Sequence, residues 1–344
     1  MTLKSPGRRA VLLNDTSFAA HHGSRHVVET IRSCLADRGI EIIASAASGK
    51  AWDEMSTIRQ AIEVADVIVI NGEGTLHHGA EAGELLLDAV NHPLCEGKPL
   101  VLINTLWQDN PGSWTELLKY MDFIVVRDGR SRNALTSAGI SVMLCPDLSF
   151  YRRFRNHGEP LPERTAFGDS VYRDVSKQLM SAYRAFQGPK IYLPIRSSRR
   201  HQERSPSLSM RGRIDNLKHR ARAAARRLVD SEYRQLPDVD AYVSELGACS
   251  FHVTGRYHAA CLSIVARVPF VAVASNSWKI ESLIEDIGLD RRRIMSSTAA
   301  AVEQGTLPYS QEESDNIKAW LDLSRERTEA LFDTIAQLAV SRGS

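Results

Sequence analysis

Residues 66–79 have the sequence DVIVINGEGTLHHG, in which a short apolar run is followed at once by glycines and polar side chains. The apolar part has the length and the β-branched composition of a strand. The glycine-rich part is typical of a turn between a strand and a helix. Helical patterns lie on both sides, at 54–65 and 82–91, so this stretch predicts one repeat of an α/β fold.

The same alternation extends over the first 150 residues and predicts a parallel, doubly wound sheet of the Rossmann type. Strands are predicted at 10–14, 41–44, 66–71, 99–104, 122–126 and 141–145. Helices are predicted at 24–38, 54–65, 82–91, 112–121 and 131–137. Gly39 and Gly139 follow helical patterns, where a left-handed residue often ends a helix.

The periodicity weakens between residues 151 and 187, which predicts a linker and the start of a second unit. It then returns as a strand at 190–196, a helix at 214–228, and alternating elements at 239–248, 251–254, 257–266, 270–274 and 280–287. A long helix is predicted at 310–340. We therefore expect an N-terminal Rossmann-like domain at 1–165, a C-terminal Rossmann-like domain at 166–309, and a C-terminal helix at 310–344 that packs back toward the N-terminal domain.

The predicted fold class is α/β, with two Rossmann-like domains facing across a cleft, an architecture called GT-B. In such folds ligands bind beyond the carboxyl ends of the strands. The loops that follow strands are therefore the places to search for chemistry.

The composition is that of an ordinary globular protein, with 43% hydrophobic and 24% charged residues in a chain of 344. No apolar run approaches the ~20 residues of a membrane span, and residues 1–9 lack the apolar core of a signal peptide. These features predict a cytoplasmic location. Five widely spaced cysteines without a C-x-x-C pair argue against a disulfide framework or a zinc site.

The net charge is only +2, but the charges are unevenly distributed. Ten arginines and Lys218 lie between Arg196 and Arg227, against two acidic residues, so this basic segment carries +9. A basic field over the whole surface, as nucleic-acid binding requires, is absent. The segment can be interpreted as a docking surface for an anionic partner. A solvated helix face with a flexible loop is an equally good interpretation.

Two loops of the first half carry polar groups after predicted strands. Asn14 begins a polar loop that leads to two histidines and a glycine at a helix start, a natural site for an anion or a hydroxyl group. The second loop contains Asn71, Gly72, Glu73, Gly74, Thr75 and His77. Its glycines permit close approach of a ligand to the backbone, Glu73 has the chemistry of a base, and His77 could assist. An ordinary tight turn between a strand and a helix explains the glycines but not the cluster of a glutamate with two histidines, and no nucleotide-binding glycine motif is present.

The sharpest motif is TGRYH at 254–258, between a predicted strand and a helix. Arg256 and His258 lie in the first helical turn, where the helix dipole favours an anion. Downstream, Asn276 and Lys279 follow the next predicted strand and offer an amide and an ammonium group. The alternative is that Arg256 only pairs with a carboxylate and His258 only completes a turn.

Four motifs in order resemble the polysaccharide pyruvyl transferases. They are the Asn71–His77 loop, the Val126-Arg127-Asp128 segment with Ser131, Leu135 and Gly139, the Pro146-Asp147 pair, and the 254–258 motif with Pro269-Phe270. The resemblance runs from about Asn14 to about Leu289, although residues 151–238 carry no matching motif.

The resemblance implies transfer of a pyruvyl group from phosphoenolpyruvate to a sugar, with formation of a ketal and release of phosphate. Arg256, Arg127, Lys279, Asn276 and Arg196 are then expected to bind the anionic donor, which the C-terminal domain should hold mainly, through Arg256 and Lys279. His258 is the expected general acid and Glu73 the expected base, with Asn14, Asn71, Gly72, Gly74, Thr75 and His77 as further substrate-binding residues. The scheme requires no cofactor and no metal.

The expected partners are phosphoenolpyruvate and a glycan or lipid-linked sugar, without nucleic acid, and with peripheral membrane contact through the basic segment 196–227. Two other functions fit parts of the sequence. A GT-B glycosyltransferase could use the same cations on a nucleotide-sugar, and a non-catalytic protein could dock through the basic segment on an acidic polymer or membrane.

Overall fold

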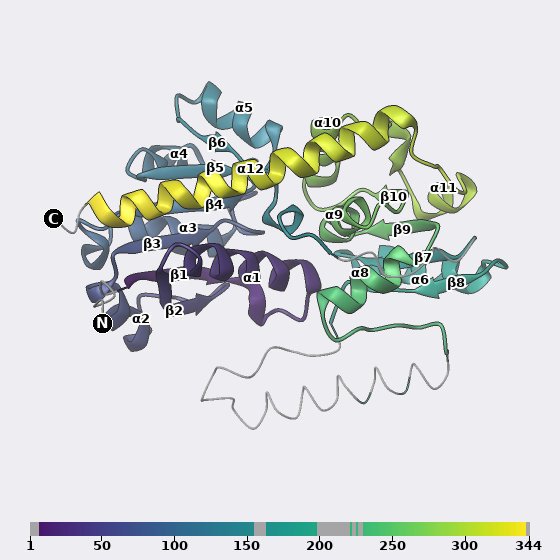
Figure 1. Ribbon diagram of the computed structural model, residues 1–344, viewed down its shortest axis with the longest axis horizontal. Coiled ribbons are helices and arrows are strands. Elements are labelled where there is room, and N and C mark those ends of the chain that lie inside the picture. The colour runs from purple at the N-terminus through teal and green to yellow at the C-terminus, as the bar shows by residue number, and fades with distance from the viewer. Residues whose placement is uncertain (1–6, 155–162, 198–220, 222–224, 226–229, 342–344) are drawn as a thin grey trace, which may run out of the picture. The chain divides into compact units, whose positions relative to one another are not determined.

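The computed structural model describes residues 7–154, 163–197, 221, 225 and 230–341 of the chain (Figure 1). Contacts divide the chain into two compact units. Unit 1 comprises residues 1–16, 27–151 and 322–344, and unit 2 comprises residues 17–26 and 152–321. The predicted boundaries at 165 and 309 remain a proposal.

Unit 1 is built on a six-stranded sheet in which all neighbouring strands are parallel. Its strands are β1 (Arg8–Asp15), β2 (Ile40–Ala47), β3 (Val67–Asn71), β4 (Leu100–Thr105), β5 (Phe123–Val126) and β6 (Met143–Leu144). The order β2-β1-β3-β4-β5-β6 is the flavodoxin-like variant of a doubly wound sheet. Its topological switch point lies between β1 and β3, where ligands bind in this class of fold.

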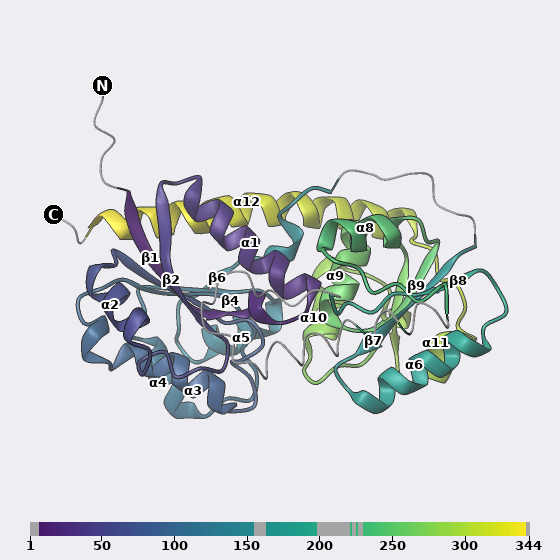
Figure 2. The same cartoon turned by 90° about the horizontal axis from the view of Figure 1, so that it is seen from below.

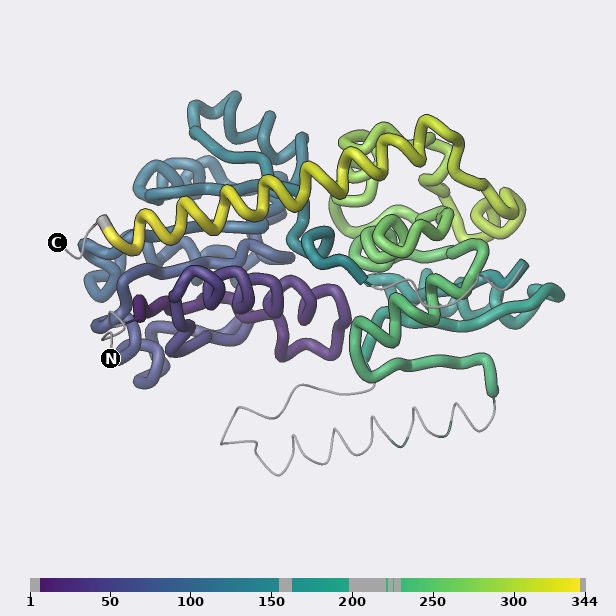
Figure 3. Tube along the Cα trace, in the orientation of Figure 1, coloured from purple at the N-terminus to yellow at the C-terminus, as the bar shows by residue number. Residues whose placement is uncertain are grey.

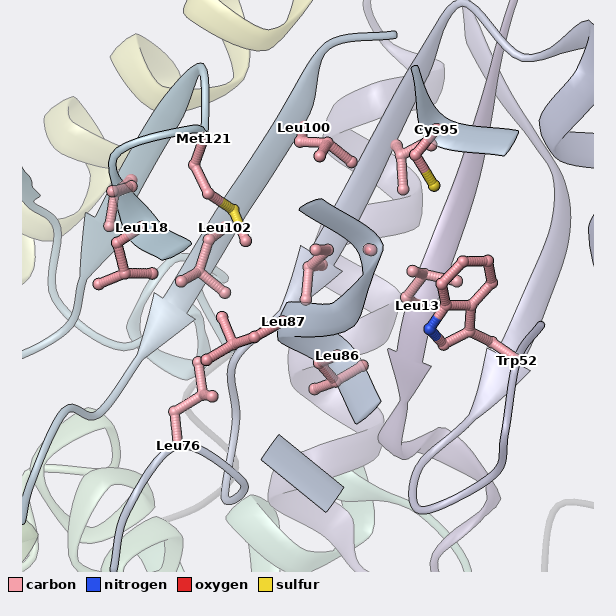
Figure 4. Close-up of a cluster of buried hydrophobic side chains, with 14 of the residues drawn as sticks. Leu13, Trp52, Leu76, Leu86, Leu87, Cys95, Leu100, Leu102, Leu118 and Met121 are labelled. Carbon is pink, nitrogen blue, oxygen red and sulfur yellow. The ribbon is translucent and has the colours of Figure 1, made fainter. Parts of the chain in front are cut away.

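Helices cover both faces of this sheet, because successive residues of each strand point to opposite sides. On one face Val11 and Leu13 share a core with α2 (Ser56–Val64), α3 (Glu81–Leu87), α4 (Gly112–Leu118) and α5 (Gly129–Ser137) (Figure 4). On the other face Ala10 and Leu12 pack with α1 (His22–Ala36) and with the last turns of α12 (Gln311–Ser341). Short 3-10 helices are η1 (Thr16–Phe18), η2 (Asp88–Val90), η3 (Pro93–Cys95) and η4 (Leu148–Phe150).

Unit 2 repeats the same topology with five parallel strands. They are β7 (Thr165–Ser170), β8 (Lys190–Tyr192), β9 (Phe251–Gly255), β10 (Phe270–Val273) and β11 (Ile294–Met295). The order β11-β10-β9-β7-β8 places the first and third strands of the unit side by side, as in unit 1. The switch point of unit 2 therefore lies between the ends of β7 and β9.

Two layers of helices also flank the sheet of unit 2 (Figure 2). Ala166 and Ile191 pack with α8 (Val239–Gly247) and α9 (Tyr257–Val265). Phe167, Val253 and Val271 pack with α6 (Arg173–Ala185) and α11 (Thr298–Glu303) on the opposite face. The described part of unit 2 also contains α10 (Lys279–Ile287) and η5 (Arg291–Arg293).

The predicted strand and helix alternation is confirmed in both units, and Figure 3 lets the reader follow it along the trace. Each strand and helix predicted within the first 150 residues is present. β7 and α6 lie in the stretch where no element was predicted, and β11 and α11 were also missed. The predicted helix at 214–228 lies almost wholly outside the described residues. No helix in the described part of the chain is both long and apolar enough to cross a membrane.

Candidate functional site

At the switch point of unit 1, Asn14 organises the loop that follows β3. Asn14 has a left-handed backbone, with φ 62°, at the carboxyl end of β1. Its amide nitrogen donates hydrogen bonds to the carbonyls of Asn71 and, at 3.2 Å, of Glu73. The hydroxyl of Thr16 donates to the carboxylate of Glu73 at 2.7 Å. The structure thus brings Asn14, Asn71 and Glu73 together, and buries all three.

Gly72 and Gly74 are required for different reasons, one for lack of space and the other for its backbone conformation. A Cβ on Gly72 would lie 2.1 Å from the hydroxyl oxygen of Thr105, so no side chain fits there. Gly74 has φ +73°, a conformation that glycine adopts without strain. The hydroxyl of Thr75 lies 3.5 Å from the Asn14 amide, whereas the His77 ring lies 5.2 Å from that of His78. The loop geometry therefore explains both glycines without a ligand.

Arg127, expected from the sequence to bind the donor, lies buried in unit 1. Its Nη1 donates to the Asp147 carboxylate at 2.9 Å, and the two side chains are 3% and 0% exposed. The neighbouring Asp128 caps α5 by accepting a hydrogen bond from the Ser131 amide at 2.9 Å. Arg127 and Asp128 therefore both stabilise the fold of unit 1. A donor-binding role for Arg127 stays a prediction.

At the switch point of unit 2, Asp169 joins the ends of two strands. Its Oδ2 accepts hydrogen bonds from Nε and Nη2 of Arg256 at 3.0 and 2.9 Å. Its Oδ1 accepts from the Ile195 amide at 3.0 Å. The ion pair that the alternative interpretation of Arg256 required is therefore present. Nη1 of Arg256 makes no hydrogen bond within the described residues, and the side chain remains 18% exposed.

His258 lies beside a second histidine from a distant part of the chain. The rings of His21 and His258 are 5.3 Å apart and inclined at 66°. Gly23 permits this approach, because a Cβ there would lie 2.3 Å from Cβ and Cγ of His258. Burial lowers the pKa of His21 well below its usual value, and electrostatic interactions with His258, Arg256, His22 and Lys279 lower it further. His21 is therefore neutral at pH 7 and able to accept a hydrogen bond, as its Nδ1 does from the Ser24 amide at 3.2 Å.

Backbone hydrogen bonds hold the His21 segment against the chain that follows β8. The His22 amide donates to the Ile195 carbonyl, and the Ser197 amide donates to the Ala20 carbonyl, both at 3.1 Å. Arg25 reinforces the pairing with a hydrogen bond of 2.9 Å to the Ser197 hydroxyl. Arg196 lies between these two anchors, and its side chain is exposed.

Lys279 and Asn276 contact each other at the start of α10. The ammonium group of Lys279 donates to the Asn276 amide oxygen at 2.6 Å. The charge of Lys279 also contributes, as the smallest of several causes, to the lowered pKa of His21. Contacts thus join Lys279 to Asn276, His258 to His21, and Arg256 to Asp169, all within unit 2.

A cavity of about 750 Å³ opens beside Arg256 in unit 2. Within the described part of the chain, its charged lining consists of Arg173, Lys177, Arg184, Arg196 and Arg256 against the carboxylate of Asp169. A concave site with this excess of cations is suited to an anionic ligand. Among the described residues, no group of three or more His, Cys, Asp or Glu could hold a metal ion.

Sequence reasoning missed His21 and Asp169 as members of this site. His21 belongs to a loop that the sequence did mark as an anion or hydroxyl site, but nothing local indicated its approach to His258. Asp169 lies on β7, in the stretch without recognisable periodicity.

Two units, each built on a parallel sheet flanked by helices, define an α/β protein of the GT-B type, and solved structures support that class. A putative UDP-N-acetylglucosamine 2-epimerase from Listeria monocytogenes matches with a TM-score of 0.52 and 9% identity, covering 94% of this chain and 91% of its own. HepE from Anabaena, solved with UDP and glucose, matches with a TM-score of 0.51 and 10% identity, covering 96% and 98%. These identities show a shared fold only.

The family follows from the sequence itself. Residues 97–277 match the family model of the polysaccharide pyruvyl transferases, and the chain belongs to this family. The protein is therefore a transferase, and the family resemblance is confirmed; three of the four motifs lie within the matched residues, and the Asn71–His77 loop lies outside them. No curated protein matches the chain.

Proposed function

We propose that the protein transfers the pyruvyl group of phosphoenolpyruvate to a sugar of a cell-surface or extracellular glycan, forming a ketal and releasing phosphate. The observation that carries this proposal is that His258, which contacts His21, lies two residues from Arg256, which pairs with Asp169 at the switch point of unit 2. It joins an imidazole, which can hold a proton, to cations suited to a substrate with a phosphate and a carboxylate.

Asp169 orients the main donor-binding group. The Asp169 carboxylate accepts hydrogen bonds from Nε and Nη2 of Arg256, so Nη1 is the nitrogen that can donate to a bound anion. A guanidinium fixed in this way binds an oxyanion with little further loss of side-chain entropy. In our proposal Arg196 and Lys279 supply further positive charge, and Asn276 keeps Lys279 in place.

His258 is the proposed general acid. It donates its proton to the methylene carbon of phosphoenolpyruvate, and the adjacent carbon becomes a cationic centre that a sugar hydroxyl oxygen attacks. The bond from that carbon to the phosphate oxygen then breaks, and a second hydroxyl of the same sugar forms the other ketal bond. Glu73, the proposed base, accepts a hydroxyl proton during attack and then releases it; over the whole cycle one of the two hydroxyl protons restores His258 and the other leaves with phosphate, so the reaction balances without a cofactor.

Unit 1 supplies the proposed acceptor side. Glu73 is the candidate base, and the Thr16 hydroxyl at 2.7 Å fixes the position of its carboxylate. Asn14, Asn71, Thr75 and the backbone at Gly72 and Gly74 surround it in the proposed substrate-binding loop. The acceptor side then corresponds to the predicted domain 1–165 and the donor side to 166–309. A cytoplasmic location and membrane contact through 196–227 are parts of the same proposal.

The donor is tested by thermal denaturation with phosphoenolpyruvate and, separately, with UDP-glucose and UDP-N-acetylglucosamine. A ligand at about 100 times its Kd stabilises by ~2.7 kcal/mol. We expect phosphoenolpyruvate alone to stabilise the protein. Stabilisation by a nucleotide-sugar without any effect of phosphoenolpyruvate would instead establish the glycosyltransferase alternative.

The role of His258 is tested by two substitutions at saturating donor. His258→Ala should lower kcat by roughly 10²–10⁴-fold. His258→Gln should be nearly as slow, because an amide keeps a hydrogen-bond donor but gives up no proton at neutral pH. His92→Gln, at a histidine that caps η3 in unit 1, is the matched control and should keep full activity. Near-normal kcat in His258→Gln would remove His258 from the catalytic step.

A further inference from the structure

The wall of the unit 2 cavity formed by α6 carries a row of cations that donor binding does not require. Arg173, Lys177 and Arg184 all line the cavity. They are separated by four and seven residues, which corresponds to about 6 and 10 Å along a helix and keeps all three on one face. The opposite side of α6 is committed to the core, where Leu179 and Tyr183 pack against the sheet.

Acidic neighbours compensate this row only in part. Asp174 contacts the Lys177 ammonium at 2.7 Å, but both side chains are well exposed, so the pair is weak. Asp169 is already engaged by Arg256. The α6 wall therefore retains positive charge over about 16 Å, the length of helix between Arg173 and Arg184.

The size of the cavity exceeds what the donor needs. Phosphoenolpyruvate is a three-carbon molecule, and in the proposed reaction it needs only the part of the lining at Arg256 and Arg196. Of the lining residues, Arg256 is the nearest in sequence to His258, and His258 does not itself line the cavity. Cavities of 300–1,000 Å³ typically bury drug-sized ligands, and this one has about 750 Å³. A longer ligand with several separated negative groups fits both the volume and the row of charges.

We propose that Arg173, Lys177 and Arg184 form a subsite for carboxylates of an acidic glycan on sugars other than the one that reacts, whose hydroxyls the unit 1 loop is proposed to bind, so that the preferred acceptor is a polyanionic saccharide. This inference rests on the proposed function for the identification of the acceptor as a glycan. A diphosphate would concentrate its charge at one point, whereas these cations are spread along the helix. Tyr192 and Tyr233, which stack on each other at 5.4 Å, form part of the cavity lining but are almost fully buried, so the accessible lining is dominated by the charged side chains. Each ketal formed adds a carboxylate, so a chain already modified presents the same groups.

The test measures binding of tetragalacturonate, a chain of four uronic acids, by isothermal titration calorimetry. Neutral galactotetraose and pyrophosphate are the comparison probes. The variant is the triple substitution R173Q/K177Q/R184Q, and the charge-matched control is R291Q/R292Q/K318Q, at exposed positions of unit 2 outside the cavity. We expect wild type and control to bind tetragalacturonate and the triple variant to bind at least about tenfold more weakly, with loss of affinity in higher salt.

Phosphoenolpyruvate separates failure of this inference from failure of the proposed function. The triple variant should keep the thermal stabilisation by phosphoenolpyruvate, because Arg256 and His258 are intact. If phosphoenolpyruvate stabilises wild type but tetragalacturonate does not bind, or binds the triple variant equally well, the glycan subsite is wrong. Binding of pyrophosphate in preference to tetragalacturonate also overturns it, in favour of a diphosphate-bearing acceptor. If phosphoenolpyruvate stabilises neither protein, the proposed reaction itself fails.

Discussion

Gly23→Ala should damage activity through His258 without removing any functional group. An alanine Cβ at this position would lie 2.3 Å from Cβ and Cγ of His258 and 2.8 Å from Nδ1. Carbon atoms in favourable contact are separated by about 3.5–4.0 Å, so the imidazole must retreat by about 1 Å. A misplacement of about 1 Å in an active site can cost ~10²-fold in rate.

The stability change combines two opposing effects. Replacing glycine by alanine within a helix ordinarily stabilises it by up to about 1 kcal/mol. Overpacking a tight contact destabilises by about 1–3 kcal/mol. We therefore expect Gly23→Ala to lower the free energy of unfolding by roughly 0–2 kcal/mol, as measured by urea denaturation, while kcat falls far more than this small change in folding explains.

A matched glycine and a double variant make the assay specific. At Gly247, the last residue of α8, an added Cβ would meet no atom within 4 Å, so Gly247→Ala should leave kcat unchanged. Because Gly23→Ala acts on His258, adding it to His258→Ala should cause little further loss of kcat. Wild-type kcat in Gly23→Ala, or full additivity with His258→Ala, would refute the reasoning.

Three further predictions concern charges and protons. Asp169→Asn loses the charge-assisted hydrogen bonds to Arg256, so the KM for phosphoenolpyruvate should rise about tenfold; an unchanged KM would mean that Asp169 does not orient the donor site. Burial lowers the pKa of both His22 and His252 to about 3, whereas their unfolded value is near 6.5, so the unfolded state binds more protons below that pH. Unfolding free energy should therefore fall by about 2 kcal/mol per histidine between pH 7 and pH 5, a slope that urea midpoints measure and that His252→Asn should reduce. Arg293 is fully buried, contacts the Glu313 carboxylate at 2.7 Å and donates hydrogen bonds to three carbonyls. Arg293→Lys should therefore lower the free energy of unfolding, measured by urea denaturation, by roughly 3 kcal/mol. Arg291→Lys, at an exposed side chain, should change it little.

The alternation of strands and helices was predictable wherever apolar residues recur with the period of the element. β3, with the sequence VIVIN, is buried at every residue and was evident from composition alone. β7, with the sequence TAFGDS, is equally buried but contains a glycine, an aspartate and hydroxyl residues. The carboxyl end of β7 belongs to the site, where Asp169 accepts a hydrogen bond from Arg256. The polar residues that the site requires replace the apolar residues by which a buried strand is predicted.

The candidate site was predictable only where its residues share a local motif. The 254–258 motif placed Arg256 and His258 together because they are two residues apart on one helical turn. The proximity of His21 to His258 depends on the hydrogen bonds of Ala20 and His22 to the chain after β8, which no local pattern encodes. Arg127 was expected to bind the donor, but it is buried against Asp147. Sequence alone does not distinguish an arginine that binds a ligand from one that forms a buried ion pair.

The division of unit 1 into separate chain segments has a consequence for how the protein is made. Leu331, Phe332 and Ile335, near the carboxyl end of α12, belong to the same core as Ala10 and Leu12 of the first strand. A ribosome that has delivered the whole of β1–β6 has therefore not yet delivered the side chains that close one face of their sheet. Unit 2, whose last residue is Leu321, has its full sequence available earlier. Synthesis from the amino terminus thus completes the second unit of the chain before the first, and leaves an apolar face of the first unit open until the last turns of α12 have emerged.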